Sequence, residues 1–462
     1  MTTTPQLKRV LGLTDVVLFN VVVIFSVRGM TTAAKMGPVS IILWLFAVAA
    51  FFIPLGLAVT ELATRDCEEG GLYRWTRDAF GEAHGFQCAW FYWVSNVTYL
   101  PSLLIFLAGA VAFVVGRPAL GDDPWYVCGL SLGVLWFTAW LNIRGLEAGK
   151  LLTNSGALAS WIAALILIAA GAVALAHFGS ATTFNGAAFT QAVGGKQALA
   201  YFGTLSFALV GLELAPVMGG EIKDPKRTLP RAILISALTI AVLYVVGTLA
   251  ILVALPSDQV SPISGALGAA QAVANRVGFP IVGALMAALI SFSVVGGVAA
   301  WLGGAARLPL VVGIDRFLPP AMAKLHPKHG TPHVSILLQT VITSVFIVAS
   351  QAGATVREAY LVLLDMTIVM NFIPFLYLFL AMPRLRPEQD EPNVVRAPGG
   401  RGVLWLVALA GLGATVATLI SAVIPPPDVG VGLFEGKLWG GLILFGVIGY
   451  LIYARYRNRT TS

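Results

Sequence analysis

The stretch FNVVVIFSVRGMTTAAKMGP, residues 19–38, places Arg28 deep inside a long apolar run. A lone charged side chain at the centre of a bilayer costs about 2.5–3.5 kcal/mol on insertion scales. A membrane segment can keep an arginine at this depth only if its surroundings compensate the charge. The stretch therefore raises the question of what lies beside Arg28.

The composition identifies the whole chain as an integral membrane protein. Hydrophobic residues make up 58% of its 462 residues and charged residues only 11%, which leaves too little polar surface to cover a soluble globule. The first apolar run follows Lys8 and Arg9, lacks a small-residue cleavage pattern and leads into a second run, so we interpret it as a span and not a signal peptide. The three cysteines show no disulfide or zinc spacing.

Runs of about 20 apolar residues predict twelve membrane spans. They cover roughly 13–35, 38–62, 84–116, 124–141, 151–177, 197–220, 231–255, 279–305, 333–351, 358–382, 402–424 and 438–454. With both termini in the cytoplasm, the outside segments hold only Arg117, Lys196, Arg276, Arg357 and Lys437 of the 29 lysines and arginines. This asymmetry follows the positive-inside rule, so the basic charge sets orientation in a cell membrane and predicts no nucleic-acid partner.

The chain leaves no room for a soluble domain, because no segment between spans exceeds about thirty residues. We expect one transmembrane domain over residues 1–455 and a short cytoplasmic tail over 456–462. The sequence contains no G-x-S-x-G, no H-E-x-x-H and no proper phosphate loop, so we expect neither an enzyme nor a cofactor. His326, His329 and His333 have metal-like spacing, but helix-breaking residues surround them and no carboxylate or thiolate joins them, so no metal site is predicted.

Three ionisable residues stand out within the predicted spans: Arg28, Glu213 and Asp365. Such residues are functional candidates by default. The helical rise places Arg28 roughly 10 Å and Asp365 roughly 12 Å from the outer ends of their spans, at similar depths. Two interpretations stay open: a structural ion pair between Arg28 and Asp365, or a cavity between them in which a zwitterionic or amine-bearing solute completes the pairing.

The sixth predicted span carries signals of a broken helix. Its sequence, YFGTLSFALVGLELAPVMGGEI, residues 201–222, contains Gly203, Gly211 and Pro216. Unwound backbone at the midplane frees N–H and C=O groups for the carboxylate and ammonium of a ligand. The alternative is helix packing through small residues. The first span is less suggestive, with Gly29 as the only glycine in its central stretch. Asn96 in the third span is either a ligand contact or an interhelical hydrogen bond.

Several stretches together resemble the amino acid-polyamine-organocation transporters. These are EEGGLYRWTRDAFG (68–81), FALVGLE (207–213) followed by EIKDPKRTLPRA (221–232), and GIDRFLPPAMAKLHPKHGTP (313–332). The similarity runs from about residue 10 to residue 382. It implies an all-α, LeuT-like fold of two inverted repeats of five spans, about 13–177 and 197–382, with discontinuous helices one and six and two additional helices over about 402–454.

The resemblance also implies a substrate site at the two helix breaks. Its expected members are Ile24, Phe25, Ser26, Val27, Arg28 and Gly29 for the carboxylate, the carbonyls of Phe207 and Val210 beside Gly211 for the amine, Phe207 and Trp301 as gates, and Asp365 for a distal cationic group. The usual glycine-rich break in span one is absent, so Arg28 is expected to supply the positive charge. Ser160 stands where some members carry a coupling lysine, so no coupling ion is predicted. Glu213 is a candidate proton carrier.

The leading hypothesis is a secondary active transporter, a permease or exchanger, that moves an amino acid by alternating access. A polyamine or agmatine transporter is the alternative, ranked second because the fixed charge of Arg28 repels polycations. A solute-binding sensor or a channel is the alternative of another class. The expected partners are an amino acid or amine substrate, the lipid bilayer and a second copy in a homodimer.

Overall fold

The computed structural model describes residues 9–460 except 191–194, 261–264, 352–355, 387–393 and 425–430. Within these ranges the chain is helical, and its one β-type contact is an isolated parallel bridge between Leu11 and Ile222. Eleven of the helices are long and apolar enough to cross a membrane. The chain is therefore a multi-pass membrane protein.

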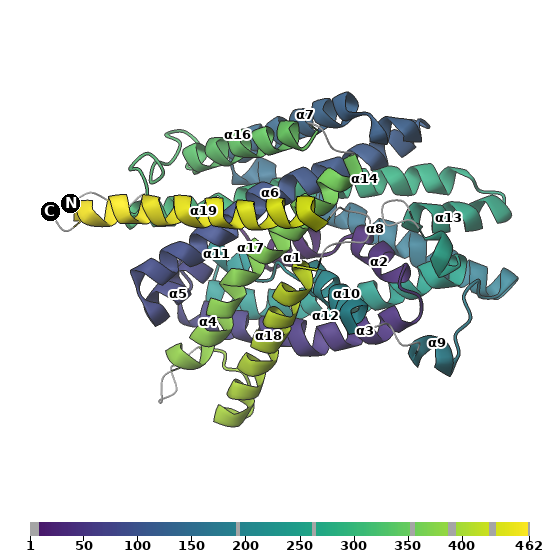
Figure 1. Cartoon of the computed structure of the whole chain (residues 1–462), viewed down its shortest axis with the longest axis horizontal. Helices are drawn as coiled ribbons and strands as arrows, with labels where there is room; N and C mark the ends of the chain where they lie inside the picture. Colours follow the sequence, from purple (N-terminus) through teal and green to yellow (C-terminus); the bar gives the residue numbers. More distant parts are fainter. Residues whose placement is uncertain are drawn as a thin grey trace.

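The helices form a bundle in which segments distant in sequence lie side by side, such as α7 and α16 along the top of Figure 1. Short helices cap its two ends, α5 at the left of Figure 1 and α9 and α13 at the right. The elements are α1 Leu13–Ile24, α2 Val27–Ala34, α3 Val39–Ala47, η1 Val48–Phe52, α4 Ile53–Arg65, α5 Leu72–Phe80, α6 Glu82–Val114, η2 Pro118–Asp122, α7 Pro124–Arg144, α8 Leu146–Phe178, α9 Gly186–Thr190, α10 Gly195–Ala208, α11 Leu214–Val217, η3 Gly219–Glu221, α12 Pro225–Ala254, η4 Ser257–Gln259, α13 Gly265–Arg276, α14 Ile281–Ala305, α15 Arg307–Ile314, α16 His333–Ser350, α17 Val356–Leu385, α18 Gly400–Ala422 and α19 Val431–Thr460.

The first predicted span consists of two helices, α1 and α2. Between them Phe25 and Ser26 adopt extended backbone conformations, with ψ angles of 121° and 129°. The last nine residues of α1 are all buried, so this interruption lies in the interior of the bundle. The run of β-branched residues at 21–24 disfavours helix only slightly, and contacts from neighbouring helices hold the break.

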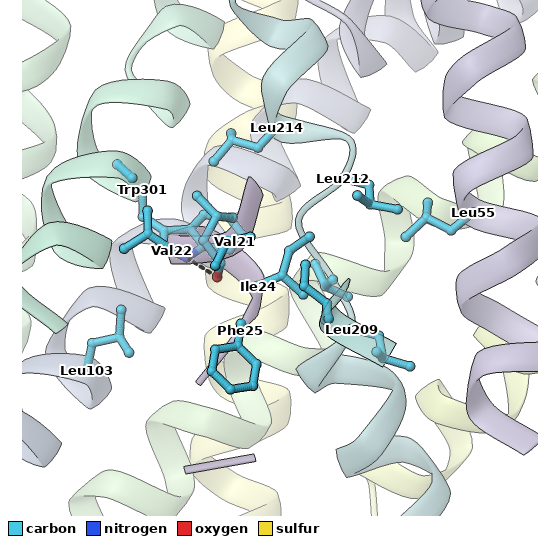
Figure 2. Packing of buried hydrophobic residues seen from close by; sticks show 14 of the residues in the cluster. Val21, Val22, Ile24, Phe25, Leu55, Leu103, Leu209, Leu212, Leu214 and Trp301 are labelled. Carbon is cyan, nitrogen blue, oxygen red and sulfur yellow. Dashed lines mark hydrogen bonds between the residues drawn. The ribbon is translucent and has the colours of Figure 1, made fainter. Parts of the chain in front are cut away.

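The sixth predicted span is interrupted as well, and it is not among the eleven membrane-crossing segments. Residues 209–213 connect α10 to the short α11 without a continuous helix, and Gly211 has a φ of 136° that L side chains rarely adopt. A Cβ at Gly211 would also lie 2.6 Å from the side chains of Val23 and Ile24. The two interruptions thus pack directly against each other, as Figure 2 shows for Ile24, Leu209 and Leu212.

Ion pairs gather at the end of the bundle that carries α5, here called the basic end and comprising turns 66–71, 142–150, 219–224 and 315–332. Lys150 pairs with Asp15 at 2.8 Å, and Arg77 pairs with Asp315 at 2.5 Å. These contacts tie together helices that start or stop at this end. These ion pairs therefore hold helix ends together at the basic end.

Candidate functional site

A cavity of about 30 Å³ lies at the interruption of the first helix. Its lining combines apolar side chains from α1, α2, α6 and α14 with a few polar groups, one of them on α8, and Arg28 is the one charged residue among the lining residues. The lining is Val22, Val23, Phe25, Ser26, Val27, Arg28, Tyr99, Leu103, Phe106, Ser160, Ile290, Ser293, Val294, Gly297 and Trp301. A water molecule needs at least about 10–15 Å³ of such space. The cavity therefore has room for one or two waters, and an amino acid requires it to widen.

Aromatic rings compensate part of the charge of Arg28. Its guanidinium carbon lies 5.8 Å from the ring centroid of Tyr99 and 5.9 Å from that of Phe106. Cation–π contacts contribute about 0.5–2 kcal/mol each, more when the groups are removed from water, and the side chain here is only 9% exposed. The cavity and these rings are part of what surrounds the arginine in the opening stretch.

Asp365 does not take part in this arrangement. No ion pair joins Arg28 to Asp365 in the part of the chain that the structure describes, and Asp365 on α17 is absent from the cavity lining. Its Oδ2 atom is buried and accepts no hydrogen bond from any described residue. The structural ion pair that the sequence left open is therefore not formed in this conformation.

The hydroxyl of Tyr244 on α12 connects the two interruptions. It accepts a hydrogen bond from the backbone N–H of Ser26 at 3.2 Å and donates to the carbonyl oxygen of Ile24 at 2.7 Å. The carbonyl oxygen of Ala208, at the end of α10, lies 3.0 Å from the same hydroxyl. Backbone groups freed by a helix break must find partners when they are buried, and this fully buried tyrosine supplies partners to both breaks.

Trp301 and Phe207, the two predicted gate residues, flank Tyr99. The Tyr99 ring makes edge contacts with Phe207, at 5.6 Å between centroids, and with Trp301, at 5.4 Å. The indole Nε1 of Trp301 donates to the carbonyl oxygen of Val23 at 3.1 Å, and the indole lies beside the end of α1 in Figure 2. The three rings form one aromatic wall next to the first break.

The carboxylate of Glu213 holds the second break. One oxygen accepts from the hydroxyl of Tyr92 at 2.8 Å and the other from the backbone N–H of Gly211 at 3.0 Å. The residue is fully buried. Asn96 lies one turn beyond Tyr92 and donates to its carbonyl oxygen at 2.9 Å, within its own helix.

The structure divides the predicted site residues into two sets. Phe25, Ser26, Val27, Arg28 and Trp301 line the cavity, whereas the lining lacks Ile24, Gly29, Asn96, Phe207, Val210, Gly211, Glu213 and Asp365. Gly29 instead allows the ring of Tyr244 on α12 to pack closely against α2, since a Cβ at this position would lie 2.8 Å from that ring. Sequence reasoning missed Tyr99, Phe106, Ser293 and Tyr244, because a single aromatic or hydroxyl group in an apolar helix carries no distinguishing pattern.

Metal binding finds no support at the three clustered histidines. The rings of His326 and His329 lie 4.7 Å apart and those of His326 and His333 lie 5.3 Å apart. Even so, no group of three His, Cys, Asp or Glu residues among those described could hold a metal ion. The His326 ring instead accepts backbone N–H groups of Lys328 and His329.

The sequence of this chain is similar to the sequences of membrane transport proteins. The sequence model of one family, described as amino acid permease, matches residues 11–452. An uncharacterized transporter of Legionella pneumophila is 31% identical over 98% of this chain and 99% of its own length. A probable agmatine/putrescine antiporter of Lactococcus lactis is 24% identical over 97% of this chain and 95% of its own. A glutamate/gamma-aminobutyrate antiporter of the same species is 21% identical over 88% and 83%.

Proposed function

Because the chain belongs to the amino acid permease family, we propose that it is a secondary active transporter, a permease or exchanger, that moves an amino acid across the cell membrane by alternating access. The observation that carries the proposal is the small polar cavity at the first helix break, with Arg28 in its lining. Two interrupted helices that meet at the bundle interior are the arrangement in which transporters bind solutes near the midplane.

The proposed architecture has twelve spans, with inverted repeats over about 13–177 and 197–382 and two further helices over about 402–454. The interrupted sixth span, made of α10 and α11, adds the twelfth crossing to the eleven long helices. Both termini then face the cytoplasm, and so does the basic end, in agreement with the distribution of lysine and arginine. With ion pairs holding helix ends together at the basic end, access to the cavity from the cytoplasm requires these contacts to separate.

In the proposed binding mode, the guanidinium of Arg28 receives the substrate carboxylate. The hydroxyls of Ser26, Ser160 and Ser293 line the same cavity and can donate to a carboxylate. The carbonyls of Phe207 and Val210, at the second break, are the proposed partners of the ammonium group. For substrate to enter, the cavity must widen, and the Phe207–Tyr99–Trp301 wall is the proposed moving part.

Two substrate classes have support. A cation and hydroxyls in the lining favour a substrate with a carboxylate, such as the amino acids named for one relative. The name of the other relative favours agmatine or putrescine, and Asp365, whose Oδ2 atom is buried, would then bind the distal cationic group. We rank amino acids first, because Arg28 lines the cavity and Asp365 does not.

Reconstituted proteoliposomes test the proposal. Wild-type protein is expected to take up, or exchange, a labelled amino acid with saturable kinetics, and to transport putrescine and agmatine more weakly. The panel should contain acidic, neutral and basic amino acids and gamma-aminobutyrate, each with empty and preloaded vesicles. If no member is taken up or exchanged while electrical recordings show open-channel currents, the transporter proposal is wrong. Preferential uptake of putrescine or agmatine would replace amino acids with the second substrate class.

A further inference from the structure

The turn over residues 66–71 docks on the inner half of the interrupted sixth helix. The backbone N–H of Gly70 donates to the carbonyl oxygen of Val217 at 3.2 Å. A Cβ at Gly219 would overlap the carbonyl oxygen of Cys67, so the two backbones approach as closely as a glycine permits. This contact joins the end of α4 to the segment that continues from the second helix break.

A buried ion pair lies at this contact. Arg307, the first residue of α15, meets the carboxylate of Glu221 with two nitrogens, at 3.0 and 3.2 Å. Its remaining nitrogen donates to the carbonyl oxygen of Gly303. The side chains of Arg307 and Glu221 are 2% and 4% exposed. One arginine charge is thus matched by one carboxylate, with little access to water.

Glu69 brings a second carboxyl group to this pair. Its side chain lies against Gly220, where a Cβ would be 3.1 Å from Oε1. That Oε1 atom is buried and has no hydrogen-bond partner among the described residues. Burial raises the pKa of Glu69 to about 8; the charges of Glu221 and Glu68 add to the rise and that of Arg307 opposes it. The other charged groups of the turn are Glu68 and Asp66, both bound to Arg74.

We propose that Glu69 is a proton-binding residue of the gate at the basic end, so that docking of turn 66–71 on the sixth helix takes up one proton and undocking releases it. In the docked state an ionised Glu69 would add a second carboxylate near one arginine, with its Oε1 atom shielded from water. In the undocked state water solvates the group, and its pKa returns toward the ordinary value near 4.3. The proton enters and leaves at the same end, so it regulates the gate and is not itself transported.

The sign of the pH dependence follows from these two states. Between about pH 4.3 and pH 8 the docked state holds a proton that the undocked state has lost, so rising pH favours undocking. The undocking equilibrium constant should increase about tenfold per pH unit in this window and level off above pH 8. Acidification at the basic end should keep the gate closed.

Hydrogen exchange of the purified full-length chain tests this inference without any substrate. Exchange of segments 66–71 and 214–221, corrected for the intrinsic effect of pH, should rise between pH 5.5 and pH 8 in wild type and then level off. Glu69→Gln, which keeps the shape of the protonated side chain, should exchange at least about tenfold more slowly than wild type at pH 7.5, with no pH dependence. The control Glu68→Gln changes an exposed neighbour and should keep the rise with pH, with the upper limit of the rise at a lower pH, because the charge of Glu68 adds to the raised pKa of Glu69.

Two results would overturn the role of Glu69. One is a wild-type profile that stays flat over pH 5.5–8, a measurement that needs no variant. The other is a Glu69→Gln protein that keeps the wild-type slope. Neither result depends on what the protein transports, so a failure here is distinguishable from a failure of the proposed amino acid transport.

Discussion

The interruption of the first helix contains no glycine, whereas that of the sixth turns at Gly211 with a φ of 136°. The first break is held from outside, by the hydroxyl of Tyr244 on a neighbouring helix. The second is held from within, by the carboxylate of Glu213 two residues from Gly211. The second break is thus indicated by its local sequence. The first break depends on a contact with a residue more than two hundred positions away in the sequence. Substitutions at the two breaks should therefore act in different ways.

The largest effect is expected at Gly211. Gly211→Ala places a Cβ against Val23 and Ile24 and forces an L residue into a rare backbone conformation. Backbone strain and overpacking each cost about 1–3 kcal/mol, so we expect a loss of about 3 kcal/mol or more, seen as a lower unfolding temperature in detergent. Gly413→Ala, on α18 with nothing within 4 Å of the added Cβ, is the control and should leave stability unchanged or raise it. If both variants unfolded at the same temperature, the second break would not require a glycine at position 211.

The second break is easier to predict from the sequence than the first. Gly211 and Pro216 indicate an interruption in the sixth span directly, because both weaken a helix locally. The first break is supported in the sequence only by β-branched residues and by the family resemblance. Tyr244 could not be identified, since a tyrosine in an apolar helix gives no sign of which backbone group its hydroxyl meets.

Depth is likewise easier to predict than position around the bundle. The helical rise places Arg28 and Asp365 at similar levels, yet the described residues form no ion pair between them. Rise along a helix says nothing about the direction in which a side chain points or which helices are neighbours. The sequence therefore identified Arg28 and Asp365 as charged residues within spans but not their surroundings.

Arg28 at the first break should matter for substrate more than for folding. Arg28→Gln removes the charge proposed to bind a carboxylate, and hydrogen bonds to charged groups contribute about 1.5–3 kcal/mol. The KM for amino acid uptake into proteoliposomes should rise about 10- to 100-fold. Arg276→Gln provides the control: that arginine also contacts an aromatic ring, at 5.4 Å from Phe178, but lies outside the cavity lining. An unchanged KM in Arg28→Gln would refute the proposed carboxylate contact.

A smaller effect is expected from Tyr244→Phe, which removes a hydroxyl that lies within hydrogen-bond distance of both breaks. The N–H of Ser26 and the carbonyl of Ile24 lose their hydroxyl partner, and an unsatisfied buried group costs about 1–3 kcal/mol. Chemical or thermal unfolding at constant pH measures the loss. Tyr126→Phe is the matched control, because its hydroxyl makes one long hydrogen bond of 3.3 Å to Ala108 at a partly exposed site. If both variants lose equally little stability, Tyr244 does not hold the breaks.

The smallest effect on amino acid transport is expected at Asp365, which lies outside the cavity lining. Asp365→Asn should change the KM for a zwitterionic amino acid by less than about twofold, because less than about 0.4 kcal/mol is lost when a group does not meet the substrate. For agmatine or putrescine the same variant should sharply raise KM if Asp365 binds their distal cation. Asp258→Asn, at an exposed position in η4, controls for the loss of a carboxylate elsewhere. A large loss of zwitterion transport in Asp365→Asn would mean that the acid reaches the substrate once the cavity widens, and the first break would then carry both charges.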